Sequence, residues 1–96
     1  MIHDEAMLQY EEDQRAFKIN EERDKFSFLE IHTCDDGYDY TFYKSDYTEY
    51  DGGQLDNPEL SIIKAVEELL NDEGIDISKA IPIDYDLFIG KLNSNL

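Results

Sequence analysis

The chain has 96 residues, of which 24 are Asp or Glu and 8 are Lys or Arg, so its formal net charge is −16 at pH 7. The length predicts a single domain over residues 1–96, and the 41% of hydrophobic residues suffice for one small core. No apolar run reaches the roughly 20 residues of a membrane-spanning helix. A surface this acidic repels nucleic acid and anionic lipid, so we expect direct binding to neither.

The cysteine content and the N-terminal residues predict the cellular compartment. Cys34 is the one cysteine, so an internal disulfide is excluded. The first five residues lack the basic and apolar regions of a secretory signal. Both features are typical of a protein of the reducing cytoplasm, which is where we expect this chain.

The first predicted element is a helix from residue 4 to about residue 24, peripheral to a core formed by residues 26–96. Asp4 is a suitable N-cap. The apolar residues of the segment recur at roughly helical spacing: Ala6, Met7, Tyr10 and Phe17. The stripe they form is thin, so this helix needs a partner surface to be stable.

Three strands are predicted next, over residues 26–33, 38–44 and 47–51. The first alternates in polarity, and the second is rich in aromatic residues and Thr, which favour strands. The turn between them contains Gly37, which adopts positive φ without strain. Together the three segments predict an antiparallel meander.

Two helices complete the predicted fold. Ser61 is the expected N-cap of a helix over residues 62–73, and Gly74 ends it. Its apolar face contains five residues: Ile62, Ala65, Val66, Leu69 and Leu70. Asp84 is the expected cap of a last short helix that ends near residue 93. The order α-β-β-β-α-α predicts an α+β domain with the helices packed on one face of a three-stranded antiparallel sheet.

Motifs for catalysis or metal binding are weak. His32 and Cys34 lie two residues apart on a predicted strand, hence on one face, but no second pair completes a four-ligand zinc site. The acidic turns lack EF-hand spacing, and the Gly-rich segment lacks the features of a phosphate loop. We therefore expect no metal, no cofactor and no catalytic residue. An enzyme that uses His32 and Cys34 is the third of the hypotheses considered.

Acidic residues are concentrated between residues 35 and 59. This segment contains eight Asp or Glu residues and one basic residue, Lys44, and tyrosines are interspersed among the acidic residues. The net charge exceeds the roughly 2–8 that solubility requires, and such a surface resembles the phosphates of nucleic acid. We predict that these carboxylates and two aromatic anchors bind a partner: Asp35, Asp36, Asp39, Asp46, Glu49 and Asp51, with Tyr38 and Tyr47. The competing interpretation is an acidic face that only keeps the protein soluble.

Three segments carry a resemblance to a known family: DYTFY at residues 39–43, DGG at 51–53 and LDNPELS at 55–61. They resemble the large polyvalent-protein-associated domains of conjugative elements and phages, which occur alone or beside helicase, methylase and relaxase modules. The resemblance covers residues 26–90 and carries no catalytic residue. It implies a mobile element, whose small proteins often counter host defence, including acidic inhibitors of CRISPR nucleases and restriction enzymes.

The leading hypothesis is an acidic inhibitor without enzymatic activity. Its partner would be a basic nucleic-acid-binding protein, such as a CRISPR effector nuclease, whose groove it occupies. The alternative is an accessory or scaffold domain of a conjugative element, with Met7, Tyr10 and Phe17 of the first helix as its docking surface. A homodimer stays open under either hypothesis.

Overall fold

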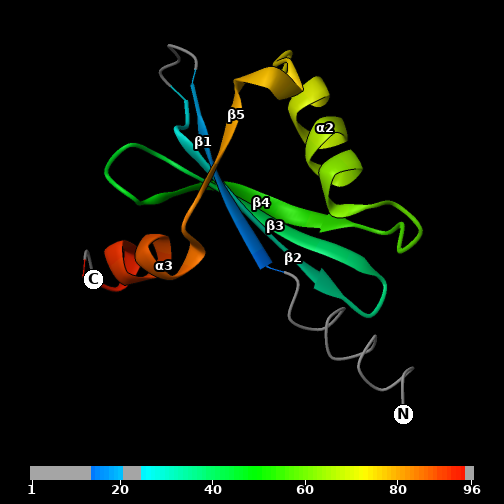
Figure 1. Ribbon diagram of the computed structural model, residues 1–96, viewed down its shortest axis with the longest axis horizontal. Helices are drawn as coiled ribbons and strands as arrows, with labels where there is room; N and C mark the ends of the chain where they lie inside the picture. Colours follow the sequence, from blue (N-terminus) through cyan, green and yellow to red (C-terminus); the bar gives the residue numbers. More distant parts are fainter. Residues whose placement is uncertain (1–13, 21–24, 95–96) are drawn as a thin grey trace.

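One five-stranded antiparallel sheet with a helix on each face forms the fold (Figure 1). The computed structural model describes residues 14–20 and 25–94. Across the sheet the strands follow the order β4-β3-β2-β1-β5. In chain order the elements are β1 (Gln14–Ile19), β2 (Phe28–Cys34), β3 (Gly37–Tyr43), β4 (Glu49–Leu55), α2 (Ile62–Asp72), the 3-10 helix η1 (Ile77–Lys79), β5 (Ala80–Ile83) and α3 (Tyr85–Ser94).

Strand β1 corrects the prediction of an N-terminal helix. Its residue Phe17 pairs with Leu29 of β2 on one side and with Pro82 of β5 on the other. Phe17 and Ile19 alternate into the core and are 3% and 4% exposed. The spacing of the apolar residues is compatible with a helix, but the segment forms a strand. Pairing with β2 and β5 buries Phe17 and Ile19, and this burial outweighs the small helix propensities of the six residues. The remainder of the predicted helix, residues 4–13 and 21–24, lies outside the described residues.

The prediction of a three-stranded meander with both helices on one face is also wrong, because β1 and β5 extend the sheet to five strands. The two helices lie on opposite faces (Figure 1). The Phe88 ring of α3 packs against two rings of the sheet, with its centroid 5.6 Å from that of Phe28 and 5.5 Å from that of Tyr43. These two strand residues alternate with the core residues Leu29 and Phe42, so they face the other side.

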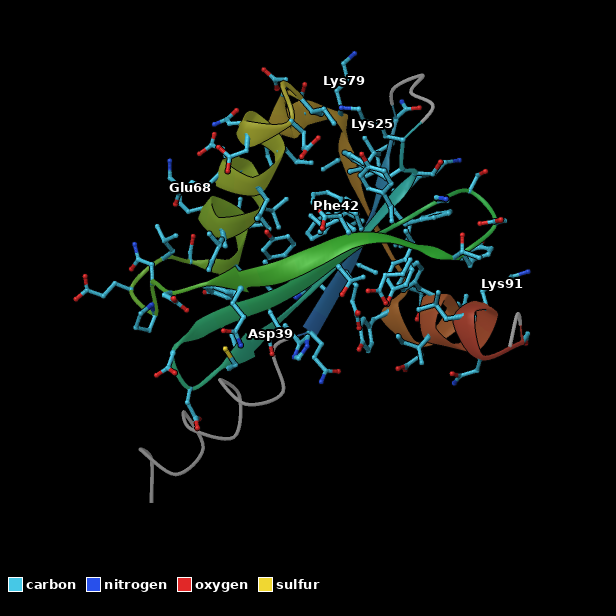
Figure 2. All side chains as sticks on the ribbon, turned by 180° about the vertical axis from the view of Figure 1, so that it is seen from behind. Lys25, Asp39, Phe42, Glu68, Lys79 and Lys91 are labelled. Atoms are coloured by element: carbon cyan, nitrogen blue, oxygen red, sulfur yellow. The ribbon has the colours of Figure 1, made fainter. Side chains whose placement is uncertain are left out.

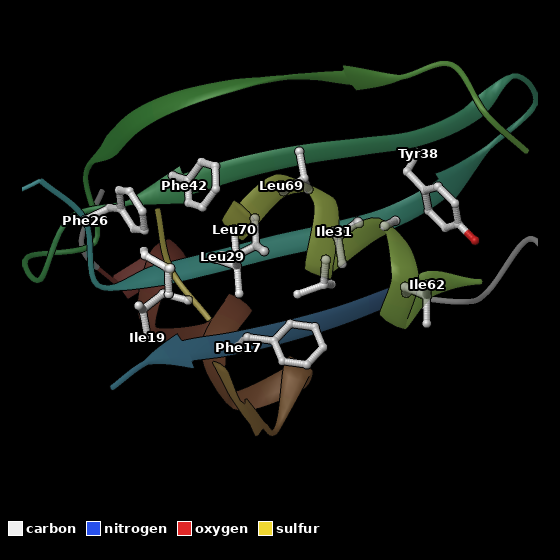
Figure 3. Packing of buried hydrophobic residues seen from close by; sticks show 13 residues of the cluster. Phe17, Ile19, Phe26, Leu29, Ile31, Tyr38, Phe42, Ile62, Leu69 and Leu70 are labelled. Carbon is white, nitrogen blue, oxygen red and sulfur yellow. The ribbon is translucent and has the colours of Figure 1, made fainter. Parts of the chain in front are cut away.

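The core lies between α2 and the sheet. Three of its fully covered side chains come from the middle of the sheet and the helix: Leu29, Ile31 and Leu70. Figure 3 shows Phe26 beside Phe42 at one end of this layer, with ring centroids 4.3 Å apart, and Tyr38 and Ile62 towards the other end. The domain therefore has one apolar layer, and the opposite sheet face depends on α3 for its cover.

Helix α2 forms where the sequence predicts it. The Ser61 hydroxyl accepts a hydrogen bond from the Lys64 N–H at 3.2 Å, as expected of an N-cap. At the other end, Gly74 has φ of 74° and its N–H donates to the Asn71 carbonyl. The Ile75 N–H then donates to the Leu70 carbonyl, which completes a glycine-based helix end.

Candidate protein-binding surface

The eight residues predicted to bind a partner are distributed over both ends and both faces of the sheet. Asp35 and Asp36 form the exposed turn between β2 and β3, whereas Asp46 and Tyr47 belong to the turn between β3 and β4. The seven residues of β3 separate these turns. At roughly 3.3 Å per residue, that places the turns about 23 Å apart. The other predicted residues lie on strands: Tyr38 and Asp39 on β3, and Glu49 and Asp51 on β4.

The two predicted aromatic anchors both pack inside the domain. Tyr38 is 4% exposed, and its hydroxyl donates to the Leu60 carbonyl. The Tyr47 ring stacks on the Phe28 ring, with centroids 4.9 Å apart and an interplanar angle of 14°. Tyr47 has a φ of 69°, which is unusual for a residue with a side chain, and its N–H donates to the Lys44 carbonyl within the same turn. Neither ring offers a partner a large free surface.

Asp46 and Asp39 each make local contacts. The Asp46 carboxylate accepts from the Thr48 hydroxyl at 2.6 Å and from the Thr48 N–H at 3.1 Å, which shapes the turn and lowers the pKa of Asp46 below its usual 3.8. Asp39 lies opposite His32 on the face that α3 partly covers, and its Oδ2 is 3.9 Å from the His32 Nε2. We therefore regard Asp46 as a turn former first.

Strand β4 brings two of the predicted carboxylates to an edge of the sheet. Its residues from Glu49 to Gln54 are exposed, and only Leu55 is partly covered. A β-bulge separates the pairing of Tyr43 with Glu49 from that of Phe42 with Asp51. Because these two partners point to opposite faces, the bulge directs Glu49 towards the α3 side and Asp51 towards the α2 side. The edge is therefore acidic on both faces.

Helix α2 adds two carboxylates that the sequence analysis did not include in the site. Burial raises the pKa of the Tyr40 hydroxyl above its usual 10.0, and neighbouring negative charges raise it further. These charges are Asp51, Asp72 and Glu73. The Tyr40 hydroxyl is therefore within electrostatic range of carboxylates from β4 and from the end of α2. We call Glu49, Asp51, Asp72 and Glu73 the acidic edge.

Glycines let the Tyr40 ring lie against β4. Tyr40 pairs with Gly53, and a Cβ on Gly53 would lie 3.0 Å from the Tyr40 hydroxyl oxygen. The DGG segment therefore leaves room for the ring between β4 and the end of α2.

Lysines lie on several elements of the domain, and Lys79 belongs to η1, which follows α2 and contacts it. Figure 2 shows Lys25 and Lys79 near the start of β5, Lys91 on α3 and Asp39 farther along the sheet. On α2, the Lys64 Nζ lies 3.2 Å from the Glu67 Oε1. The lysines are therefore spread over several elements, and the excess of carboxylates leaves the net charge at −16.

The opposite face carries a carboxylate that joins α3 to the sheet. The Tyr85 hydroxyl donates to the Glu30 Oε2 at 2.8 Å, and the Tyr43 hydroxyl donates to Oε1 at 3.4 Å. Burial and the Glu30 carboxylate raise the pKa of both tyrosines. These hydrogen bonds connect side chains of β2, β3 and α3, so we assign Glu30 a structural role.

Metal binding and membrane insertion find no site in the described part of the chain. Within residues 14–20 and 25–94, no three His, Cys, Asp or Glu side chains gather as metal ligands. None of the helices in these ranges combines the length and the apolar composition needed to cross a membrane.

Comparison with known proteins identifies the family. Residues 10–94 match the family model of large polyvalent protein-associated domain 16. This range of the chain includes β1 as well as the segments DYTFY, DGG and LDNPELS. Searches of the curated proteins and of the solved structures found no match. The matched residues span the whole sheet and both helices, and so confirm the domain type that these segments resemble. The chain therefore belongs to the large polyvalent protein-associated domain 16 family, whose members are associated with polyvalent proteins of mobile elements.

Proposed function

We propose that this domain is a non-enzymatic inhibitor that occupies the basic groove of a nucleic-acid-binding defence enzyme of the host, as a mimic of DNA or RNA. The proposed target is either a CRISPR effector nuclease or a restriction enzyme. The observation that carries the proposal is the acidic edge, where exposed carboxylates of β4 and carboxylates at the end of α2 act on one tyrosine hydroxyl, in a chain of net charge −16.

The physical argument rests on the electrostatic cost of that arrangement. Charge of one sign destabilises a small domain through self-repulsion, so carboxylates gathered at one edge call for a compensating role. A basic groove supplies it, because lysines and arginines that hold phosphates also attract carboxylates. The association of the family with mobile elements supports the setting, since such elements meet host nucleases.

Two variants of equal charge test whether position matters. The edge variant replaces Glu49, Asp51 and Asp72 with Lys, and the turn variant replaces Asp35, Asp36 and Glu59 with Lys. Each variant moves the net charge from −16 to −10, because each replacement adds two charges. The six replaced side chains are all exposed, so folding should survive, which circular dichroism would check.

The assay is capture on immobilised domain from a lysate of a host with CRISPR and restriction systems, followed by elution with duplex DNA or with salt. We expect wild type and the turn variant to retain a nucleic-acid-binding enzyme that DNA displaces, and the edge variant to lose it. Capture that persists above about 1 M salt and ignores DNA would contradict the proposal.

Such an outcome would favour the alternative, a scaffold domain that binds through apolar contacts. One observation supports this second function: Leu87 of α3 is 70% exposed. Of the docking residues expected from the sequence, Phe17 is instead buried in the core, whereas Met7 and Tyr10 lie outside the described residues. A Leu87→Ser variant that no longer captures the salt-resistant partner would identify this surface.

A further inference from the structure

We propose that the outer edge of β4 accepts an extended basic segment of the partner protein as a sixth strand of the sheet. This inference rests on the proposed function and adds the mode of binding. Strand addition uses main-chain hydrogen bonds for affinity and alternate side chains for specificity.

The two edges of the sheet differ in how well they are protected. The β5 edge has four residues and includes Pro82, which has no N–H to offer another strand. Strand β4 has seven residues, about 23 Å at 3.3 Å per residue, and proline is absent from it. Its pairing in the described part of the chain is with β3 alone, so one side of its backbone faces outward.

The geometry at Gly52 shows which backbone groups face outward. A Cβ on Gly52 would lie 2.9 Å from the Tyr40 carbonyl oxygen, so that carbonyl points towards β4. Tyr40 pairs with Gly53, so Gly53 directs its own polar groups towards β3. In an antiparallel ladder, neighbouring residues direct these groups to opposite sides. Gly52 and Gln54 therefore present their N–H and C=O groups to the outside.

At the centre of this edge, one outward-facing backbone N–H already donates to a carboxylate of β4 itself. The Gly52 N–H donates to the Oδ1 of Asp51 at 2.9 Å. A carbonyl of an added strand would take the same position, and the displaced carboxylate would then be available to a cation of that strand. Since both Gly52 and Gly53 lack side chains, the middle of the edge is open to a second backbone.

Charge decides the kind of strand that fits. Glu49 and Asp51 lie on β4 itself, and both side chains are exposed. A second copy of this chain would bring its own β4 carboxylates and a further charge of −16, so charge repulsion disfavours self-pairing. In an added strand, Lys or Arg residues at every second position all lie on one face of the sheet, and on the α2 side they would meet Asp51.

The experiment titrates the intact domain with two peptides by calorimetry. One is an all-L octapeptide of alternating Lys and Val, blocked at both ends. Its control is the diastereomer in which every Val is the D form, which has equal charge and composition and cannot continue a regular strand. The variant Gln54→Pro removes an outward N–H and leaves the net charge unchanged. The variant Glu68→Gln removes one exposed carboxylate of α2, away from the β4 backbone, and shows how much the loss of a single charge weakens binding.

We expect the all-L peptide to bind at least tenfold more tightly than the diastereomer. Its binding should slow hydrogen exchange at the Gly52 and Gln54 amides, fall at least tenfold in Gln54→Pro and stay within twofold in Glu68→Gln. Equal binding of the two peptides would overturn strand addition and leave the proposed function intact. Failure of both peptides to bind would argue against the proposed function as well. Protection of these amides that rises with protein concentration alone would show self-pairing and overturn the proposal.

Discussion

The link between α3 and the sheet gives a sharp test of the structure. Replacing Tyr85 with Phe keeps the ring and removes the hydroxyl that donates to the Glu30 Oε2 at 2.8 Å. The Tyr43 hydroxyl, at 3.4 Å from Oε1, is too distant to replace it. The Phe88 ring contacts stay, so the substitution isolates one hydrogen bond.

The expected loss follows from the charge on the acceptor. A hydrogen bond to a charged group contributes about 1.5–3 kcal/mol, and partial exposure of both side chains allows water to recover some of this. We therefore expect the free energy of unfolding to fall by about 1–1.5 kcal/mol. For a domain of this size, that corresponds to roughly 4–12 °C in Tm.

Urea denaturation monitored by circular dichroism measures the difference. Tyr50→Phe is the matched control, because it also removes a tyrosine hydroxyl and Tyr50 is 39% exposed. The double variant with Glu30→Gln should lose less than the sum of the two single changes, because Glu30→Gln removes the acceptor charge that strengthens the bond lost in Tyr85→Phe. A Tyr85→Phe loss below about 0.3 kcal/mol, or one equal to that of the control, would refute this account of α3.

Three further predictions concern the core, a turn and the pH dependence. Phe17→Ala should cost about 3–5 kcal/mol in urea denaturation, because the ring is 3% exposed, whereas a helical, peripheral residue would lose under 1 kcal/mol. Gly37→Ala should cost more than about 1 kcal/mol in the same assay, because φ is 146° and the new Cβ would lie 1.9 Å from a β4 carbonyl oxygen; an unchanged midpoint would contradict this geometry. Thermal unfolding should show stability falling as the pH rises above about 10, since Tyr40, Tyr43 and Tyr85 have raised pKa values and keep their protons in the folded state after the unfolded chain has lost them. A Tm that is constant from pH 9 to pH 11 would show that these hydroxyls are unperturbed.

Local signals predicted some of the elements well. Helix α2 follows from an N-cap at Ser61, apolar residues at helical spacing and Gly74 at its end, all within about 14 residues. The turn at Gly37 follows from the need for positive φ. Such features depend on the chain near the residue concerned, so sequence patterns report them directly.

The sheet was harder to predict because its pairing is non-local. Strand β1 pairs with β5, more than 60 residues away, and neither strand has a strong β pattern of its own. One available signal was that Phe28 and Tyr43 are aromatic on the face opposite Leu29 and Phe42. Apolar rings on both faces indicate that both faces are covered, which requires the helices to separate.

The candidate site shows the same division. Glu49 and Asp51 were predicted as binding residues from the charge pattern, and they lie on the exposed β4. That Asp51 and Asp72 both act on the Tyr40 hydroxyl depends on how α2 packs on the sheet, so no local pattern could predict it. The aromatic residues Tyr38 and Tyr47 were chosen because Tyr is common in interfaces, but Tyr is equally suited to a small core that needs area.

The central claim is that the edge of β4 binds a basic protein partner. The most direct measurement is hydrogen exchange of the Gly52 and Gln54 amides with and without the enzyme captured from the host lysate. The account predicts that exchange at both amides slows at least tenfold in the complex, while the exposed turn at Asp35 and Asp36 is unchanged. Slowing at that turn alone, with the β4 amides unaffected, would contradict it.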